Sequence, residues 1–254
     1  MNMDERKRVK SSLEELNSEF NLEELEAISM ERIEEKYAVE DKMLKAVTDG
    51  NSEAAMALMA QFETFPNTRY TANVTLQSSV IALSTLNTLF RKAVQDASVH
   101  PAHIDHVSGK FAEKILSAKC QDELMSIPSE MIRKYCLLVR SYSLKGYTVL
   151  TQKALNYIDF NLSEDLSLAY IADKLNVNKK YLSSHFKKEM GETITNYINK
   201  KRIRESLKYL GASDLAISDV ALRVGMYDLN YYSRVFKQII GMTPSQYRNM
   251  MREK

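Results

Sequence analysis

Two segments of the chain carry the same arrangement of small polar and basic side chains. One begins at Ile171 and the other at Val220, and a single inserted residue at Asp228 aligns the remainder at an offset of 50. Seven of the seventeen positions from 181 to 197 are then identical in the two copies. The residues expected to face outward are Lys179, Lys180, Ser183, Ser184 and Lys187 in the first copy, and Leu229, Asn230, Tyr231, Ser233, Arg234 and Lys237 in the second. Most are hydrogen-bond donors or fixed cations, the groups that contact an anionic, hydrogen-bonding surface such as a nucleic acid.

The first copy has the pattern of two helices joined by a tight turn. Apolar residues at helical spacing over 168–175 predict a short helix. Asn176, which tolerates left-handed backbone dihedrals, follows at the turn. Asn178 is expected to cap the next helix and Gly191 to end it. The residues expected to face inward on that helix are Tyr181, Leu182, His185, Phe186 and Met190.

The second copy repeats this pattern. An apolar stripe over 217–224 precedes Gly225 at the turn, and Asp228 is expected to cap the following helix. Its inward residues are expected to be Tyr232, Val235, Phe236 and Ile239. Each copy therefore predicts a helix-turn-helix motif, at about 167–190 and 216–240, and the second helix of such a motif enters the major groove of DNA.

A third helix, over roughly 192–210, is predicted between the two motifs. At 1.5 Å per residue it would be about 28 Å long, and one turn of B-DNA is about 34 Å. Such a spacer can set two reading helices in successive major grooves. Basic and hydroxyl side chains on the spacer and on the reading helices suit phosphate contacts. The predicted phosphate contacts are Lys179, Lys187, Lys200, Lys201, Arg202, Ser233 and Lys237.

The pattern of 171–247, with its ending Gly241-Met242-Thr243-Pro244-Ser245-Gln246-Tyr247-Arg248, resembles the AraC/XylS family of bacterial transcription regulators. The resemblance covers about residues 150–252. It implies a seven-helix domain that binds double-stranded promoter DNA through two helix-turn-helix motifs. The base contacts that it implies are Lys180, Ser183, Ser184, Leu229, Asn230, Tyr231 and Arg234. The chain departs from the family pattern at Asn176, where Gly is common, and at Ser183 and Ser184, where larger donors often lie.

Composition and charge predict an all-α chain of two domains. Only 7 Gly and 4 Pro occur in 254 residues. Residues 1–63 hold 8 Lys/Arg against 16 Asp/Glu, whereas residues 150–254 hold 17 against 11. Basic charge gathered at one end favours a nucleic-acid module joined to another domain. We predict a regulatory or dimerisation domain at 1–148 and a DNA-binding domain at 149–254.

Apolar residues at helical spacing predict that the first domain is a helical bundle. The prediction includes helices over about 70–98, 102–118 and 128–143. The acidic segment 14–41 is either the flank of a coiled coil or a solvated surface, and its heptads are too few to favour the first. No alternation is long enough for a β-barrel sensing domain. By the resemblance, homodimerisation through the N-terminal helices is expected, with RNA polymerase as a further candidate partner.

Residues that could support catalysis or metal binding are sparse. His100, His103 and His106 can be read as a metal site, but no second cluster completes a ligand set, so a hydrogen-bonded surface turn is favoured. The two cysteines, Cys120 and Cys136, are too few for a zinc site, a disulfide framework or a DNA-repair enzyme. None of the common nucleophile, phosphate-loop, dinucleotide-binding or zinc-protease motifs is present.

The prediction is therefore a sequence-specific DNA-binding transcription regulator, not an enzyme, with no cofactor, metal or effector assigned. The chain has no run of about eighteen apolar residues and no hydrophobic signal segment at its N-terminus. Together with the two cysteines, which suggest a reducing compartment, these features predict a cytoplasmic protein. The alternatives are a protein-interaction adaptor and a helical protein that binds a small ligand, neither of which would read bases.

Overall fold

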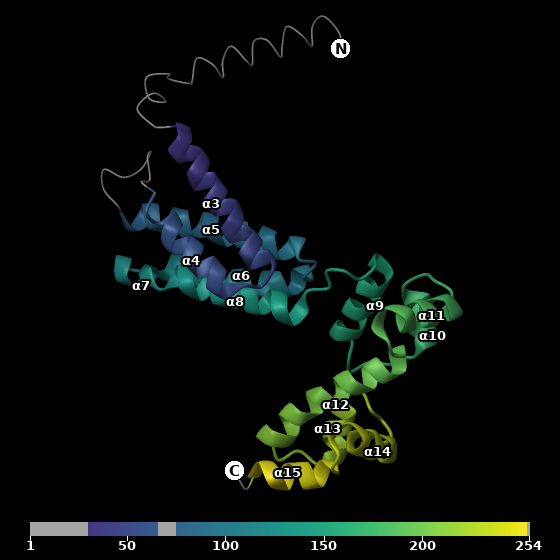
Figure 1. Cartoon of the computed structure of the whole chain (residues 1–254). Helices are drawn as coiled ribbons and strands as arrows, with labels where there is room; N and C mark the ends of the chain where they lie inside the picture. The colour runs from purple at the N-terminus through teal and green to yellow at the C-terminus, as the bar shows by residue number, and fades with distance from the viewer. Residues whose placement is uncertain (1–29, 66–74, 253–254) are drawn as a thin grey trace, which may run out of the picture. The chain divides into compact units, whose positions relative to one another are not determined.

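A computed structural model describes residues 30–65 and 75–252 of the chain. It divides the chain into two compact units between Lys145 and Gly146, three residues before the boundary expected from the sequence. Every regular element in the described ranges is a helix, which confirms the predicted all-α class (Figure 1). No helix in these ranges has the length and apolar character needed to cross a membrane.

The N-terminal unit is a helical bundle. Its described helices are α3 (Met30–Thr48), α4 (Ser52–Phe62), α5 (Leu76–Asp96), α6 (Pro101–Ser117), α7 (Gln121–Met125) and α8 (Ile127–Tyr142). The short helix α7 was not predicted from the sequence. Residues 14–29 of the acidic segment lie outside the described residues, so the choice between a coiled-coil flank and a solvated surface stays open there.

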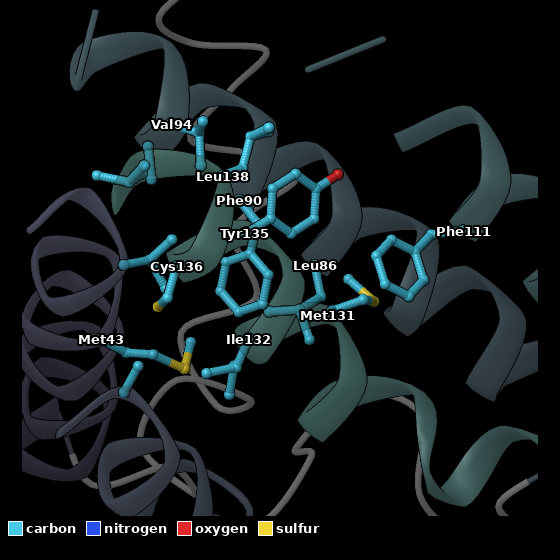
Figure 2. Packing of buried hydrophobic residues seen from close by; sticks show 14 of the residues in the cluster. Met43, Leu86, Phe90, Val94, Phe111, Met131, Ile132, Tyr135, Cys136 and Leu138 are labelled. Carbon is cyan, nitrogen blue, oxygen red and sulfur yellow. The ribbon is translucent and has the colours of Figure 1, made fainter. Parts of the chain in front are cut away.

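The core of this unit lies where α3, α5, α6 and α8 meet (Figure 2). Met43 of α3 and Phe90 of α5 are fully buried in it, as is Tyr135 of α8. The Tyr135 ring meets the edge of Phe90 at 5.8 Å and stacks on Phe111 of α6 at 5.9 Å. Aromatic contacts of this kind add to the free energy of burial, so Tyr135 ties three helices together.

The Tyr135 hydroxyl also anchors a buried polar chain. It donates to Asn87 Oδ1 at 2.6 Å, and Asn87 Nδ2 donates to the Ser108 carbonyl at 3.1 Å. Burial raises the pKa of Tyr135, so the hydroxyl stays protonated and remains a donor.

Replacing Tyr135 by Phe is expected to lower the free energy of unfolding by about 1–3 kcal/mol, because Asn87 Oδ1 is left buried without its donor. Urea unfolding followed by circular dichroism measures the loss. The matched control is Tyr142→Phe, since Tyr142 is exposed and its ring can keep its stack on His103. A loss no larger than in the control would show that water replaces the hydroxyl.

The C-terminal unit contains seven helices in its described residues, as predicted. These are α9 (Val149–Phe160), α10 (Leu168–Lys174), α11 (Lys179–Met190), α12 (Ile194–Ala212), α13 (Ile217–Arg223), α14 (Leu229–Ile240) and α15 (Pro244–Arg252). The long helix α12 begins two residues later than predicted because Thr193 is its N-cap and accepts from the Asn196 amide at 3.2 Å.

Candidate nucleic-acid interface

The turns of the two motifs have the same backbone geometry. Asn176 has φ 53° and Gly225 has φ 81°, both in the left-handed region. The Val177 amide donates to the Ala172 carbonyl at 2.9 Å, and the Met226 amide donates to the Ala221 carbonyl at 2.8 Å. Asn176 therefore supplies the left-handed turn that Gly225 supplies in the second motif.

The second helices of the two motifs, α11 and α14, are the predicted reading helices, and both begin at the predicted caps. Asn178 Oδ1 accepts from the amides of Lys180 and Tyr181 at 2.8 and 3.3 Å. Asp228 Oδ1 accepts from the amides of Asn230 and Tyr231 at 2.8 and 3.0 Å. The helices end at Gly191 and Gly241 with φ values of 72° and 87°. These local signals fix both ends of each reading helix.

The duplication extends to the packing behind the reading helices. Phe186 of α11 is fully buried and meets the Tyr197 ring edge-on at 5.7 Å. Phe236 of α14 is also fully buried and meets Tyr247 edge-on at 5.9 Å. The two pairs are related by the offset of 50 found in the sequence. Each reading helix is thus held from behind by an equivalent aromatic pair.

Most of the predicted base-contacting residues are exposed on the first turns of the reading helices. Lys180 and Ser184 are exposed on α11, and Leu229, Asn230 and Arg234 are exposed on α14. The remaining two, Ser183 and Tyr231, are half-buried. The structure therefore brings an exposed polar set together on each reading helix.

Tyr231 connects α14 to the spacer helix. Its hydroxyl accepts from Asn199 Nδ2 of α12 at 2.7 Å. The Arg234 guanidinium lies over the Tyr231 ring, 5.4 Å from its centroid. This cation–π contact restricts the rotamers of Arg234 while leaving its donors exposed. Asn199 was not singled out from the sequence, since nothing local indicates a partner 32 residues away.

The prediction that Tyr181 faces inward is wrong. Its side chain is 56% exposed, although it is equivalent to the half-buried Tyr231. The Tyr181 ring lies 5.5 Å from that of His185, one turn further along α11. The helical period placed Tyr181 on the apolar face, but the first turn of α11 extends beyond the packed core.

The residues predicted to contact phosphate fall into two groups. Lys179 and Lys187 on α11 and Lys237 on α14 are exposed, and Ser233 is half-buried beside Arg234. Lys200 of α12 forms an ion pair with Glu192 at 2.8 Å, with its side chain 48% exposed. The Glu192 side chain is only 22% exposed, so Lys200 already has a half-buried partner within the chain.

Lys201 and Arg202, which are also predicted phosphate contacts, have intramolecular partners in the structure. Lys201 Nζ lies 2.9 Å from Asp159 Oδ1, and burial is outweighed by Asp159, which raises the pKa of Lys201. Arg202 Nε donates to the Leu162 carbonyl at 3.0 Å, and its Nη2 donates to the Glu164 carbonyl at 2.6 Å. Both side chains therefore bind α9 or the residues that follow it, about forty residues earlier in the sequence. We leave both out of the interface.

The histidine cluster has structural contacts. His100 Nδ1 accepts from the Ala102 amide at 3.2 Å and caps α6, and the His103 ring stacks on Tyr142 at 4.1 Å. Among residues 30–65 and 75–252, no group of three or more potential metal ligands is close enough to hold an ion. Cys120 and Cys136 are both free thiols, and burial raises the pKa of Cys136 to about 11.

Comparison with known proteins identifies the unit that holds this interface. A family model described as a helix-turn-helix domain matches residues 171–250. The regulatory protein PocR of Salmonella typhimurium is 34% identical over 102 residues, and the transcriptional activator RhaR of Escherichia coli is 31% identical over 105. The C-terminal unit is an AraC-type helix-turn-helix domain.

The similarity is confined to a part of each protein. The match covers 40% of this chain and 34% of PocR, and 41% of this chain and 37% of RhaR. The chain thus spans about a third of the length of these relatives. The C-terminal domain of AraT, a response regulator from Geobacillus stearothermophilus, is 33% identical, covers 42% of this chain and 88% of that one, and has a TM-score of 0.41.

One relative is named as an enzyme as well as a regulator. AdaA of Bacillus subtilis, named as a bifunctional transcriptional activator and DNA repair enzyme, is 36% identical over 94 residues, which is 37% of this chain and 44% of AdaA. The relatives are mostly regulators, which agrees with the non-enzymatic prediction in part. The prediction that this chain lacks repair activity rests on its having only two cysteines, too few for the metal ligands of such an enzyme.

Proposed function

We propose that the chain is a sequence-specific transcription regulator that binds double-stranded promoter DNA, with α11 and α14 in successive major grooves. The observation that carries the proposal is the duplicated motif. Each reading helix has a side-chain cap, a left-handed Gly end and a fully buried Phe behind it, with donors exposed on its first turns. This geometry presents the N-terminal part of a helix to base edges.

The spacer helix supports simultaneous binding of both motifs. α12 has 19 residues, which corresponds to about 28 Å at 1.5 Å per residue. The repeat of the duplex is about 34 Å, so two motifs at the ends of α12 suit one face of the DNA. Bonds from α12 to both sides, through Lys201 to Asp159 and through Asn199 to Tyr231, stiffen this arrangement.

Base and phosphate contacts are divided between the exposed residues. We assign base contacts to Lys180, Ser183, Ser184, Leu229, Asn230 and Arg234, with Tyr231 positioning Arg234. Guanidinium and amide groups form bidentate hydrogen bonds with guanine and adenine, so Arg234 and Asn230 supply most of the specificity. We assign phosphate contacts to Lys179, Lys187, Lys200, Ser233 and Lys237, which add affinity without sequence information.

The N-terminal unit is proposed to form a homodimer and to control DNA binding. Large apolar side chains at its surface support this, since Met30 and Tyr37 of α3 and Ile81 of α5 are each at least 60% exposed. Sedimentation analysis of the full chain tests the dimer, and a monomer at all concentrations would exclude it. RNA polymerase remains a candidate partner of the DNA-bound form.

Selection of bound fragments from randomised DNA by the full chain tests the function directly. We expect a site with two conserved segments about one helical turn apart, and an affinity that falls steeply with salt. An adaptor would enrich no sequence and show no steep salt dependence. A ligand-binding protein would show a rise in melting temperature with a small molecule but no selected site.

Replacing Arg234 by Ala is expected to weaken binding to the selected site by about 1–3 kcal/mol, because a bidentate contact to a base is lost. Gel shifts on the selected and on a scrambled duplex measure the difference. The matched control is Lys237→Ala, one turn away on α14, which is expected to weaken binding to both duplexes equally and to reduce the salt slope by about 1. Equal losses on both duplexes for Arg234→Ala would contradict base reading by Arg234.

A further inference from the structure

A polar cluster joins the first reading helix to the start of α9. Glu189, at the C-terminal end of α11, accepts from the Thr148 hydroxyl at 3.0 Å and from the Thr148 amide at 3.3 Å. His185 Nε2, one turn earlier on α11, lies 2.7 Å from the same hydroxyl oxygen. The tautomer of His185 decides which of the two atoms donates in that contact. We call Thr148, His185 and Glu189 the clasp.

The clasp lies at the N-terminal end of α9, which has no side-chain cap of its own. Thr148 is the N-cap of α9 but makes no side-chain bond to the amides of its own helix. The carboxylate of Glu189, on another helix, instead accepts from the amide of the N-cap residue itself, at the positive end of α9. Its hydrogen bond with Thr151, followed by those with Thr148, holds the pKa of Glu189 below its usual range. Glu189 is therefore ionised at neutral pH, when its charge-assisted bonds are strongest.

The second motif has no counterpart of these polar groups. At the offset of 50, His185 corresponds to Val235 and Glu189 to Ile239, both apolar. Val235 is buried and Ile239 packs against the hydrophobic core of the second motif. At these two positions α14 thus packs against apolar side chains, whereas α11 forms hydrogen-bonding contacts with Thr148, the N-cap of α9. The caps and turns are alike in the two motifs, but these polar positions are not. The difference indicates that His185 and Glu189 have a role that belongs to the first motif.

We propose that Glu189 is a positioning residue that sets the orientation of α11 for DNA binding by bonding it to the start of α9. The proposal rests on the function proposed above. Glu189 lies at the far end of α11 from the exposed first turns, so it acts through the orientation of the helix and not by touching bases.

The clasp also lies where the chain enters the C-terminal unit. Gly146 is the first residue of that unit, and Thr148 follows two residues later. The polypeptide that arrives from the N-terminal unit is therefore bonded directly to the first reading helix. A change in the backbone at 146–148 acts on α11 through three hydrogen-bonding contacts, while α14 has no such connection through its equivalent residues.

Hydrogen exchange on the full chain without DNA tests the clasp itself. In Glu189→Ala, the Thr148 amide loses its acceptor, and exchange in residues 146–153 is expected to rise by about tenfold or more. Glu189→Gln keeps one acceptor oxygen and is expected to give an intermediate rise. Asp173→Asn is the control, because it removes an exposed carboxylate from α10 without touching the clasp. Unchanged exchange in Glu189→Ala would overturn the proposal.

Hydroxyl-radical footprinting on the selected DNA tests the effect on reading. The variant is tested at a protein concentration about tenfold above the one at which the wild type protects its site. At that concentration we expect Glu189→Ala to protect the segment bound by the second motif but not the segment bound by the first. Retention of both segments, or equal loss of both, would overturn a positioning role. If the wild type protects no DNA, the proposed function fails, and exchange across residues 179–191 then decides whether Glu189 holds α11.

Discussion

Replacing Phe236 by Ala is expected to lower the stability of the second motif by about 3–5 kcal/mol, since the ring is fully buried and the cavity cannot close. The ring lies 5.7 Å from Tyr232 and 5.9 Å from Tyr247, in a cluster that also includes Ile203 of α12. Removing it takes away the contact surface that joins α12, α14 and α15. A loss of this size is a large fraction of the stability of a single domain.

Urea unfolding and footprinting together measure this prediction. The variant should unfold at lower urea and lose protection of the DNA segment read by α14. Phe186→Ala is the matched variant, because Phe186 has the same burial and the same edge-on tyrosine in the first motif. Phe186→Ala should lose protection of the DNA segment bound by the first motif. If both variants lose the same segment, the two motifs do not read separate segments.

The elements that were predicted from the sequence are those with local signals. Asn178 and Asp228 accept from amides two and three residues ahead, and Gly191 and Gly241 end the helices, so each signal and its effect lie within a few residues. The repeat reinforced these signals, because the same feature appeared twice at one offset. The fold class and both motifs followed from composition and from such features, whereas the count of seven helices was implied by the family resemblance.

The contacts that were missed connect residues far apart in the sequence. Lys201 and Arg202 resembled phosphate contacts because a basic residue on a helix shows no sign of a partner at Asp159 or Leu162. Asn199 was overlooked for the same reason. The clasp had a signal, however, since Glu189 and Ile239 occupy equivalent positions with opposite polarity. A difference between copies is therefore as informative as an identity.

Gly225, in the turn of the second motif, lies so close to Arg202 that a larger residue there is expected to lower stability. A Cβ at Gly225 would lie 2.8 Å from the Leu162 carbonyl oxygen and 2.8 Å from Arg202 Nη2. Gly225→Ala must therefore adopt a left-handed conformation and also displace the guanidinium from its two carbonyls. The first effect costs about 1–2 kcal/mol and the loss of a hydrogen bond to a charged group about 1.5–3 kcal/mol. We expect a total loss of stability of about 2.5–5 kcal/mol.

Gly241→Ala separates the two contributions. Gly241 has φ 87°, close to the 81° of Gly225, but no atom lies within 4 Å of a Cβ built there. Gly241→Ala should therefore lower the free energy of unfolding only by the cost of the left-handed conformation, about 1–2 kcal/mol, in the same urea experiment. Equal losses in the two variants would show that Arg202 moves aside without cost. A larger loss at Gly225 would show that moving Arg202 and the Leu162 carbonyl away from the added Cβ costs free energy beyond that of the left-handed backbone.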